Sequence, residues 1–351
     1  VRGGNASLAA TSANRAAAFT LKADGNLAGD TLRWRFDGDV RNIDLRALHL
    51  SDSVAEGSVA MTGEAAFTLP KTRVTRVGRR KVTTTTPMSV DADLDISHLY
   101  WRMSGGTINA SGILAKVATD SARTRLDLDN GDLALRAFIP AGIDTIMARV
   151  TAATVILDRS MQRRQLAVDS LQEALPPFTL DLLAGENNIL SSYLLDSDIS
   201  FDSISVKAAN DSLLTASAML DGFKTGETRL DSINLNIRQR DNLLLYNLRV
   251  NNRPGTFDQF AHIDAKGFIG MDKFALLFNQ KNIQDETGFS FGSVVTMPSA
   301  DTFSLRFVPY HPIIGYKDWE INRDNFISYN IKTGHIDANI DLKGEALSLI
   351  H

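Results

Sequence analysis

The sequence contains no cysteine, and this absence removes a whole set of chemistries. Without a thiol among its 351 residues, the chain can form no disulfide bond, thiolate metal site or cysteine nucleophile. Apolar runs of about 18 residues are also missing, which excludes a membrane-spanning helix, and no signal-peptide pattern is present. The chain starts at Val1 and stops inside an alternating run at 345–351. We therefore expect an internal part of a longer protein whose targeting segment lies elsewhere.

Charge and histidine content exclude further classes of binding site. Lys and Arg number 37 against 41 Asp and Glu, for a net charge of −4, so no broad basic field is available to attract nucleic acid. The six histidines are scattered without the spacing of a zinc site. We expect no nucleic-acid partner, no metal and no cofactor.

The pattern that dominates the sequence is period-two alternation. Between residues 89 and 97 apolar side chains alternate with Asp and Ser, and similar runs recur along the chain. Asp-Gly, Gly-Asp and Asn-Asn clusters separate these runs, as is typical of tight turns between antiparallel strands. Helical spacing is confined to 162–174 and 187–195. The sequence predicts an all-β protein: an elongated, curled antiparallel sheet of many short strands, forming a groove with an apolar interior, with one or two short helices.

Domain organisation follows from the same repetition. We expect residues 1–351 to form one continuous β-groove segment, with a subdivision into 1–175 and 176–351 as the alternative. A basic, Thr-rich stretch at 71–87 indicates a hairpin loop or insertion. Within it, Arg79, Arg80 and Lys81 could contact anionic lipid headgroups. The other interpretation is a solvated loop.

The apolar side of so many short strands requires a cover, which a second sheet, a helix, a bilayer or a ligand could provide. A curled sheet with its apolar side inward suits acyl chains, because each CH₂ removed from water contributes about 0.8 kcal/mol. Phospholipid is therefore the expected ligand. The residues expected to line the groove are Val90, Leu94, Ile96, Ile233, Leu235, Ile237, Phe303, Leu305, Phe307, Ile336 and Ile340.

Three local segments carry a family resemblance. They read Ala-Gly-Glu-Asn-Asn-Ile-Leu-Ser-Ser-Tyr-Leu at 184–194, Arg-Val-Asn-Asn-Arg-Pro at 249–254, and Tyr-Lys-Asp-Trp-Glu-Ile-Asn at 316–322 with Asn-Phe-Ile at 325–327. With the alternation, they resemble the AsmA/TamB family of bacterial envelope proteins of the Bacteroidetes type. The resemblance implies a periplasmic protein, anchored in the inner membrane through a segment outside this chain. It also implies a groove that moves phospholipid or assists outer-membrane protein assembly beside a barrel partner of the BamA/TamA type.

Other classes fit parts of the pattern. A transmembrane β-barrel shares the alternation, but aromatic residues make up only 7% of the chain and form no girdles at the strand ends. A β-sandwich or solenoid adhesin, or a carbohydrate-binding module, would pack its apolar faces together. Asp-Ser-apolar triplets such as 52–54 resemble O-glycosylation sites of exported Bacteroidetes proteins, although they also suit turns.

Two motifs that suggest chemistry have simpler interpretations. The G-x-S-x-G pattern at 288–292 requires a turn from strand to helix, whereas the residues that follow continue as a strand. Asp91, Asp93 and Asp95 could suggest calcium but lack the glycine of a binding loop. In a strand they share one face and keep it wet. We expect a protein that is not an enzyme.

Overall fold

The computed structural model describes residues 4–26, 28–50, 55–77, 80–86, 88–103, 106–163, 165–195, 197–253, 260–299, 301–344 and 347–350. Strands hold 63% of the residues and helices 11%, and the large antiparallel sheet is open. The prediction of an all-β fold built on an antiparallel sheet of many strands is therefore confirmed. The chain forms two compact units. Unit 1 comprises 1–147 and 176–201, and unit 2 comprises 148–175 and 202–351.

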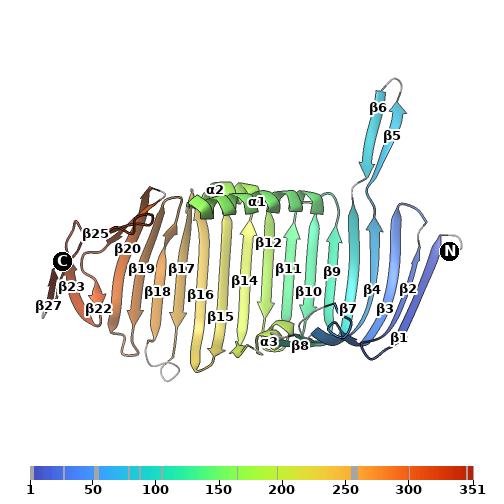
Figure 1. Cartoon of the computed structure of the whole chain (residues 1–351), viewed down its shortest axis with the longest axis horizontal. Coiled ribbons are helices and arrows are strands. Elements are labelled where there is room, and N and C mark those ends of the chain that lie inside the picture. Colours follow the sequence, from blue (N-terminus) through green and yellow to red (C-terminus); the bar gives the residue numbers. More distant parts are fainter. Residues whose placement is uncertain are drawn as a thin grey trace. The chain divides into compact units, whose positions relative to one another are not determined.

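Unit 1 is an antiparallel sheet in which strands that follow one another in the chain lie side by side (Figure 1). Its strands are β1 (Asn5–Ala13), β2 (Ala17–Asn26), β3 (Thr31–Asp44), β4 (Ala55–Thr68), β5 (Lys71–Val77), β6 (Arg80–Thr86), β7 (Ser89–Met103), β8 (Gly106–Ala110), β9 (Ile113–Thr119), β10 (Thr124–Asn130), β11 (Leu133–Ile139), β12 (Phe178–Ala184) and β13 (Ile199–Ser200). The pairing order is β1-β2-β3-β4-β7-β9-β10-β11-β12, and β8 adds to the end of β7.

Turn residues account for much of this order. The β10–β11 hairpin turns through Gly131 and Asp132, where Gly131 has φ of 59°, a conformation that glycine adopts without a steric penalty. The basic stretch that we expect to be a hairpin loop forms an antiparallel hairpin of its own, β5 with β6. Both strands are rich in Val and Thr, and these β-branched residues favour extended backbone.

Unit 2 has the same plan. Its strands are β14 (Ser203–Asn210), β15 (Leu214–Thr225), β16 (Thr228–Arg240), β17 (Leu243–Asn251), β18 (His262–Ile269), β19 (Lys273–Lys281), β20 (Thr287–Ser299), β21 (Thr302–Phe307), β22 (Ile313–Ile314), β23 (Lys317–Ile321), β24 (Phe326–Asn330), β25 (Ile336–Asn339), β26 (Asp341–Gly344) and β27 (Leu347–Ile350). Strands β14 to β20 pair in chain order. Beyond β20 the sheet splits into one branch through β21, β24 and β25 and another through β22, β23, β26 and β27.

The described residues contain three helices: α1 (Ile143–Arg163), α2 (Val168–Ala174) and α3 (Ile189–Leu195). The sequence predicts α3 and α2 within 187–195 and 162–174, but it does not predict α1, which has 21 residues. Asp144 in the first turn and Arg163 in the last turn of α1 suit the helix dipole. Helix α1 buries Ile146, Ala153 and Ser160, seven residues apart, along one line of its surface.

Hydrogen bonds with β14 and β16 fix α2 in unit 2. The buried side chain of Asn210 accepts a hydrogen bond from Gln172 Nε2 at 3.0 Å and donates to the carbonyl of Leu175 at 3.3 Å. Gln239 of β16 donates to the Asp169 carboxylate at 2.9 Å. Val168 is only 1% exposed. This short helix therefore covers the ends of β14 and β16.

Most side chains of both sheets are only partly buried. The accessible surface is 21859 Å² for a mass of 38.3 kDa. Even two separate compact domains of half that mass would together expose only about 17,000 Å². The excess indicates that, among the described residues, the sheet faces are largely open to solvent.

Candidate functional site

The register of unit 1 places the apolar residues of β7 in rows that cross the sheet. Leu94 lies opposite Gly63 of β4 and Ala115 of β9. Directly paired residues of antiparallel strands project on the same face. The apolar face of unit 1 therefore comprises the rows through Val90, Ala92, Leu94 and Ile96. The Leu94 row runs through Leu8, Ala23, Phe36, Gly63, Leu94, Ala115, Leu128, Leu135 and Leu182.

Unit 2 has an equivalent surface. The apolar face of unit 2 comprises the rows through Ile233, Leu235 and Ile237, and the last of these rows continues through Tyr246 and Gly267 to Phe307. The Leu235 row runs through Val206, Ala218, Leu235, Leu248, Ala265, Phe278 and Phe291. Leu305 and Phe303 share the face of Phe307, two residues apart on β21.

Burial confirms the alternation but also shows that these faces are open. On β7, Val90, Leu94 and Ile96 are half-buried, whereas Asp91 and Asp93 between them are exposed. The remaining groove-lining candidates of β16 and β21 are half-buried as well. Within each unit, these apolar side chains keep access to solvent along the sheet.

Aromatic rings cover glycines on the apolar face of unit 1. A Cβ added to Gly63 would lie 2.5 Å from the Phe36 ring, and one added to Gly25 would lie 2.6 Å from the Trp34 ring. Each ring therefore rests on the bare backbone of the neighbouring strand. The rings can lie flat against the sheet because the glycines have no side chain. A side chain at either glycine would push the ring away from the sheet.

A similar arrangement occurs in unit 2 with a polar group added. A Cβ at Gly267 would lie 1.8 Å from the Ala275 carbonyl oxygen and 2.9 Å from the Tyr246 hydroxyl. That hydroxyl donates to the Ala275 carbonyl at 2.8 Å, and burial raises the pKa of Tyr246. The Tyr246 ring stacks on Phe274 with centroids 6.1 Å apart. The Tyr246 hydroxyl thus has a backbone hydrogen-bond partner, and the apolar face of unit 2 gains no unpaired polar group at this cluster.

Helix α1 contributes an apolar hollow at the strand ends of unit 2. The hollow, called here the α1 pocket, has a volume of about 240 Å³. Its sheet side is part of the apolar face, since Ile269, Phe274 and Val295 are paired in one row. The α1 pocket is lined by Leu157, Ser160, Met161, Gln165, Leu166, Ile269, Gly270, Met271, Asp272, Lys273, Phe274, Val295, Met297 and Phe303.

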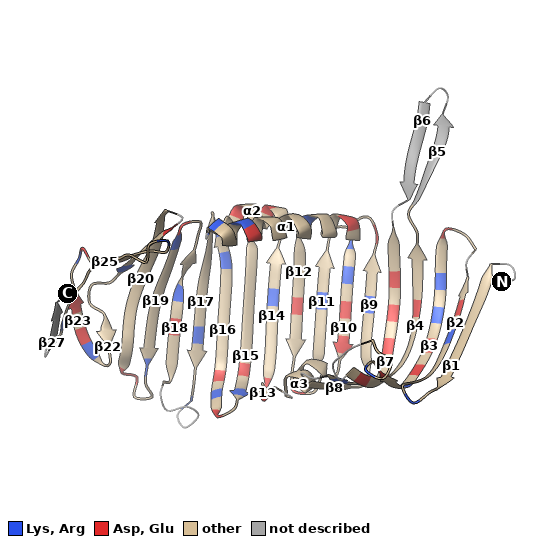
Figure 2. Ribbon diagram, in the orientation of Figure 1, with Lys and Arg blue, Asp and Glu red and all other residues tan. Residues whose placement is uncertain are grey.

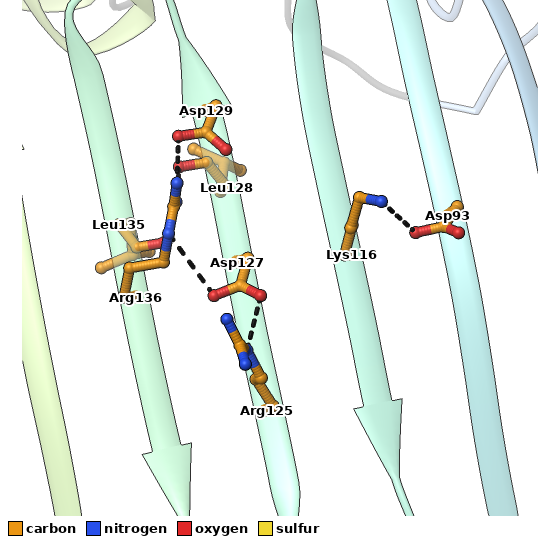
Figure 3. A network of polar contacts seen from close by, with 8 residues as sticks. All are labelled: Asp93, Lys116, Arg125, Asp127, Leu128, Asp129, Leu135 and Arg136. Carbon is orange, nitrogen blue, oxygen red and sulfur yellow. Dashed lines mark hydrogen bonds and ion pairs between the residues drawn. The ribbon is translucent and has the colours of Figure 1, made fainter.

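The opposite face of unit 1 carries a row of charges. In register order this charge row is Asp24, Arg35, Glu64, Asp93, Lys116, Asp127, Arg136 and Asp181. Charged bands cross the neighbouring strands of unit 1 in Figure 2. The Lys116 ammonium lies 3.4 Å from Asp93, and Arg136 lies 3.5 Å from Asp127 (Figure 3). Exposed pairs of this kind each contribute about 0–1 kcal/mol, but opposite charges favour one register over a shifted one.

The opposite face of unit 2 carries a smaller polar cluster. His262 contacts Asn251 at 2.7 Å through Nδ1 and Asp264 at 2.5 Å through Nε2, and Arg249 donates to Asp264 at 3.1 Å. Burial raises the pKa of Asp264, but the hydrogen bonds from His262 and Arg249 outweigh burial and hold this pKa below its usual value. The cluster lies on the face opposite to the α1 pocket and Tyr246.

The remaining sequence candidates are placed as follows. Ile336 shares the face of Phe303 through Tyr329 but is 64% exposed, and Ile340 is half-buried just after β25. Arg79 lies outside the described residues. Arg80 and Lys81 belong to β6, and their side chains are outside the described part of the structure.

The serine of the G-x-S-x-G pattern, Ser290, lies inside β20 and pairs with Asn279. The strand continues on both sides, as the sequence predicts. Across the described residues, no group of three or more His, Asp or Glu side chains is arranged to hold a metal ion.

Comparison with known proteins gives no relative: no family model matches the chain, and no curated protein or solved structure is detectably similar to it. None of the helices in the described ranges is long and apolar enough to cross a membrane.

Sequence reasoning does not find the α1 pocket. Its helical lining residues, Leu157 and Met161, belong to an apolar stripe on α1 that also includes Met147 and Val150. The i, i+3, i+4 spacing of this stripe is the signal that could have found it.

Proposed function

We propose that this chain is a periplasmic scaffold whose apolar sheet faces carry phospholipid between the inner and outer membranes, or assist outer-membrane protein assembly on the same surface. The observation that carries the proposal is the half-exposed apolar face in each unit, formed by continuous rows such as those of Leu94 and Leu235. The resemblance to the AsmA/TamB family supports the cellular setting, the inner-membrane anchor and an outer-membrane barrel partner of the BamA/TamA type.

The physical argument concerns the cost of moving lipid through water. A phospholipid with roughly thirty methylene groups loses on the order of 20 kcal/mol when it leaves a bilayer for water. A row of half-buried apolar side chains offsets part of this cost at every step along it. The charged opposite face of unit 1 keeps that side hydrated.

A β-sandwich adhesin or carbohydrate-binding module is the second candidate, and the same faces distinguish the two. A sandwich needs a second sheet about 10 Å above each apolar face. Apart from the β5–β6 hairpin, the described strands of each unit pair edge to edge in one sheet. This arrangement leaves the apolar side chains of each unit half-exposed, as lipid binding requires.

The test is native mass spectrometry of the purified chain, followed by organic extraction and lipid analysis. We expect phospholipid to co-purify with the wild-type chain, and to be reduced in Leu94→Asp and Leu235→Asp. Leu114→Asp in unit 1 and Leu277→Asp in unit 2 are matched controls. These two leucines are each 46% exposed and lie on the opposite faces, in the rows of Asp95 and Lys266.

Circular dichroism of all four variants establishes that they are folded. A folded wild-type chain without lipid would overturn the proposal and favour the adhesin. Equal lipid loss in the four variants would also contradict it, because the effect would then not depend on the apolar faces.

A further inference from the structure

We propose that the α1 pocket is a binding site for the terminal part of a single acyl chain. The inference deepens the proposed function and rests on it, because it names where on the apolar face of unit 2 a lipid tail is held. It is carried by the volume, the lining and the position of the pocket.

The volume fits a short length of hydrocarbon. An apolar cavity of about 150 Å³ accommodates benzene. On that scale, the 240 Å³ of the α1 pocket takes roughly ten carbon atoms. A second acyl chain does not fit beside the first, so the other tail of a phospholipid lies along the open sheet.

The lining suits a flexible chain rather than a rigid, polar ligand. Three of the eight methionines of the sequence, Met161, Met271 and Met297, line this one pocket. Methionine is unbranched and adapts its shape to irregular apolar ligands. Leu157 and Phe303 add branched and aromatic surface.

The exposed apolar area of the pocket indicates that it lacks an occupant from its own fold. Met161 is 70% exposed, Met271 44% and Leu157 43%. Covering such side chains is favourable, since each fully buried one contributes about 1.5–3 kcal/mol. Their clustering around one hollow points to a ligand that covers them together.

The position of the pocket explains how a tail would reach it. Phe274, in its wall, is stacked on Tyr246, which belongs to the row of Ile237. The pocket therefore opens onto the apolar face of unit 2. Lys273 and Asp272 also line the pocket. Because their charges are opposite, the pocket favours neither an anionic nor a cationic headgroup.

The experiment uses photo-crosslinking of the full chain with dodecanoic acid that carries a diazirine on its terminal carbon. Mass spectrometry of the digested protein locates the labelled residues. We expect labels on Leu157, Met161, Met271 and Phe303, and we expect unlabelled dodecanoic acid to compete more strongly than octanoic acid. The shorter acid loses contact along the pocket, which corresponds to about a tenfold weaker competition.

Two matched variants of α1 control the assignment. Met161→Asp removes an apolar contact and places a carboxylate in the pocket, so we expect labelling to fall about tenfold. Met147→Asp is the control, because Met147 is also exposed, at 59%. It lies fourteen residues earlier, about 21 Å along the helix, and we expect its labelling to stay unchanged.

The outcomes separate this inference from the proposed function. Phospholipid that co-purifies while the probe labels residues outside the α1 pocket would overturn the pocket and leave the proposed function in place. Equal labelling of the two variants would also overturn the pocket. Absence of both co-purified lipid and probe labelling would overturn both proposals.

Discussion

Units 1 and 2 share an apolar face but differ in the face behind it. In unit 1 that opposite face carries the charge row from Asp24 to Asp181, in which acidic and basic side chains alternate except at the Glu64–Asp93 pair. In unit 2 the corresponding rows mix polar residues with exposed apolar ones, such as Met219 and Leu277. The apolar faces resemble each other although their opposite faces do not. The apolar face is therefore the common feature, and the opposite face serves local needs of register and hydration.

One glycine from each unit provides a second comparison, because Gly267 is covered by backbone and Gly25 by a ring. This difference predicts the largest effect on stability. In Gly267→Ala the new Cβ meets the backbone carbonyl of Ala275 at 1.8 Å, whereas in Gly25→Ala it meets the Trp34 ring at 2.6 Å. Backbone cannot move aside as a ring can. We expect Gly267→Ala to destabilise unit 2 by about 3 kcal/mol and Gly25→Ala to destabilise unit 1 by about 1 kcal/mol, measured by urea denaturation.

Gly270→Ala is the control for this comparison. Its Cβ would meet only the end of the Leu243 side chain, so a smaller loss than for Gly267→Ala is expected. Equal losses at Gly267 and Gly25 would show that the covering rings are as immobile as backbone.

The hydrogen-bonded carboxylate of Asp132 makes the stability of unit 1 depend on pH. Burial raises the pKa of Asp132, but hydrogen bonds from Asn188 and from the backbone of Asn187 and Gly185 outweigh it and hold the pKa below its usual value. The lowered pKa stabilises the folded state fully above the unfolded value of about 3.9. This stabilisation is lost as the pH falls through the lower folded pKa.

We therefore expect Asp132→Asn to destabilise unit 1 by about 1 kcal/mol at neutral pH, a value reduced by the exposure of the side chain. The difference from the wild-type chain should shrink as the pH falls below the unfolded value and through the lower folded pKa. Urea denaturation at a series of acidic pH values measures it. A difference that stays constant across this series would show that Asp132 acts through shape and not through its charge.

The charge row predicts the smallest effect, which depends on salt. Lys116→Ala removes the contact with Asp93, and we expect a loss of about 0.5 kcal/mol at low ionic strength that vanishes in about 1 M salt. Lys266→Ala is the matched control in unit 2, because Lys266 lies between Asn247 and Leu277 and forms no ion pair among the described residues. A similar salt dependence of stability in both variants would contradict this prediction. The charge row of unit 1 would then stabilise its sheet no more than the corresponding face of unit 2 does.

The sequence predicts the faces of the strands well, since side-chain direction in a strand alternates with each residue. Val90, Leu94 and Ile96 are half-buried and Asp91 is exposed, as the alternation requires. The sequence does not predict α1. The segments Val150-Thr151 and Thr154-Val155-Ile156 are rich in β-branched residues, which favour strands when judged locally. Burial of Ile146 and Ala153 against other elements decides in favour of the helix.

By itself, the sequence determines that this protein is built from short amphipathic strands and which side of each strand is apolar, because both depend only on local alternation and turn residues. The tertiary structure decides which residues become neighbours. Register shifts near Phe19, Val40 and Ala60 change the pairing by one residue or more, and a change of one residue moves a side chain to the other face. The ring of Phe36 therefore covers Gly63 only once β3 has paired with β4. The α1 pocket likewise forms only once α1 lies beside the ends of β18 to β21.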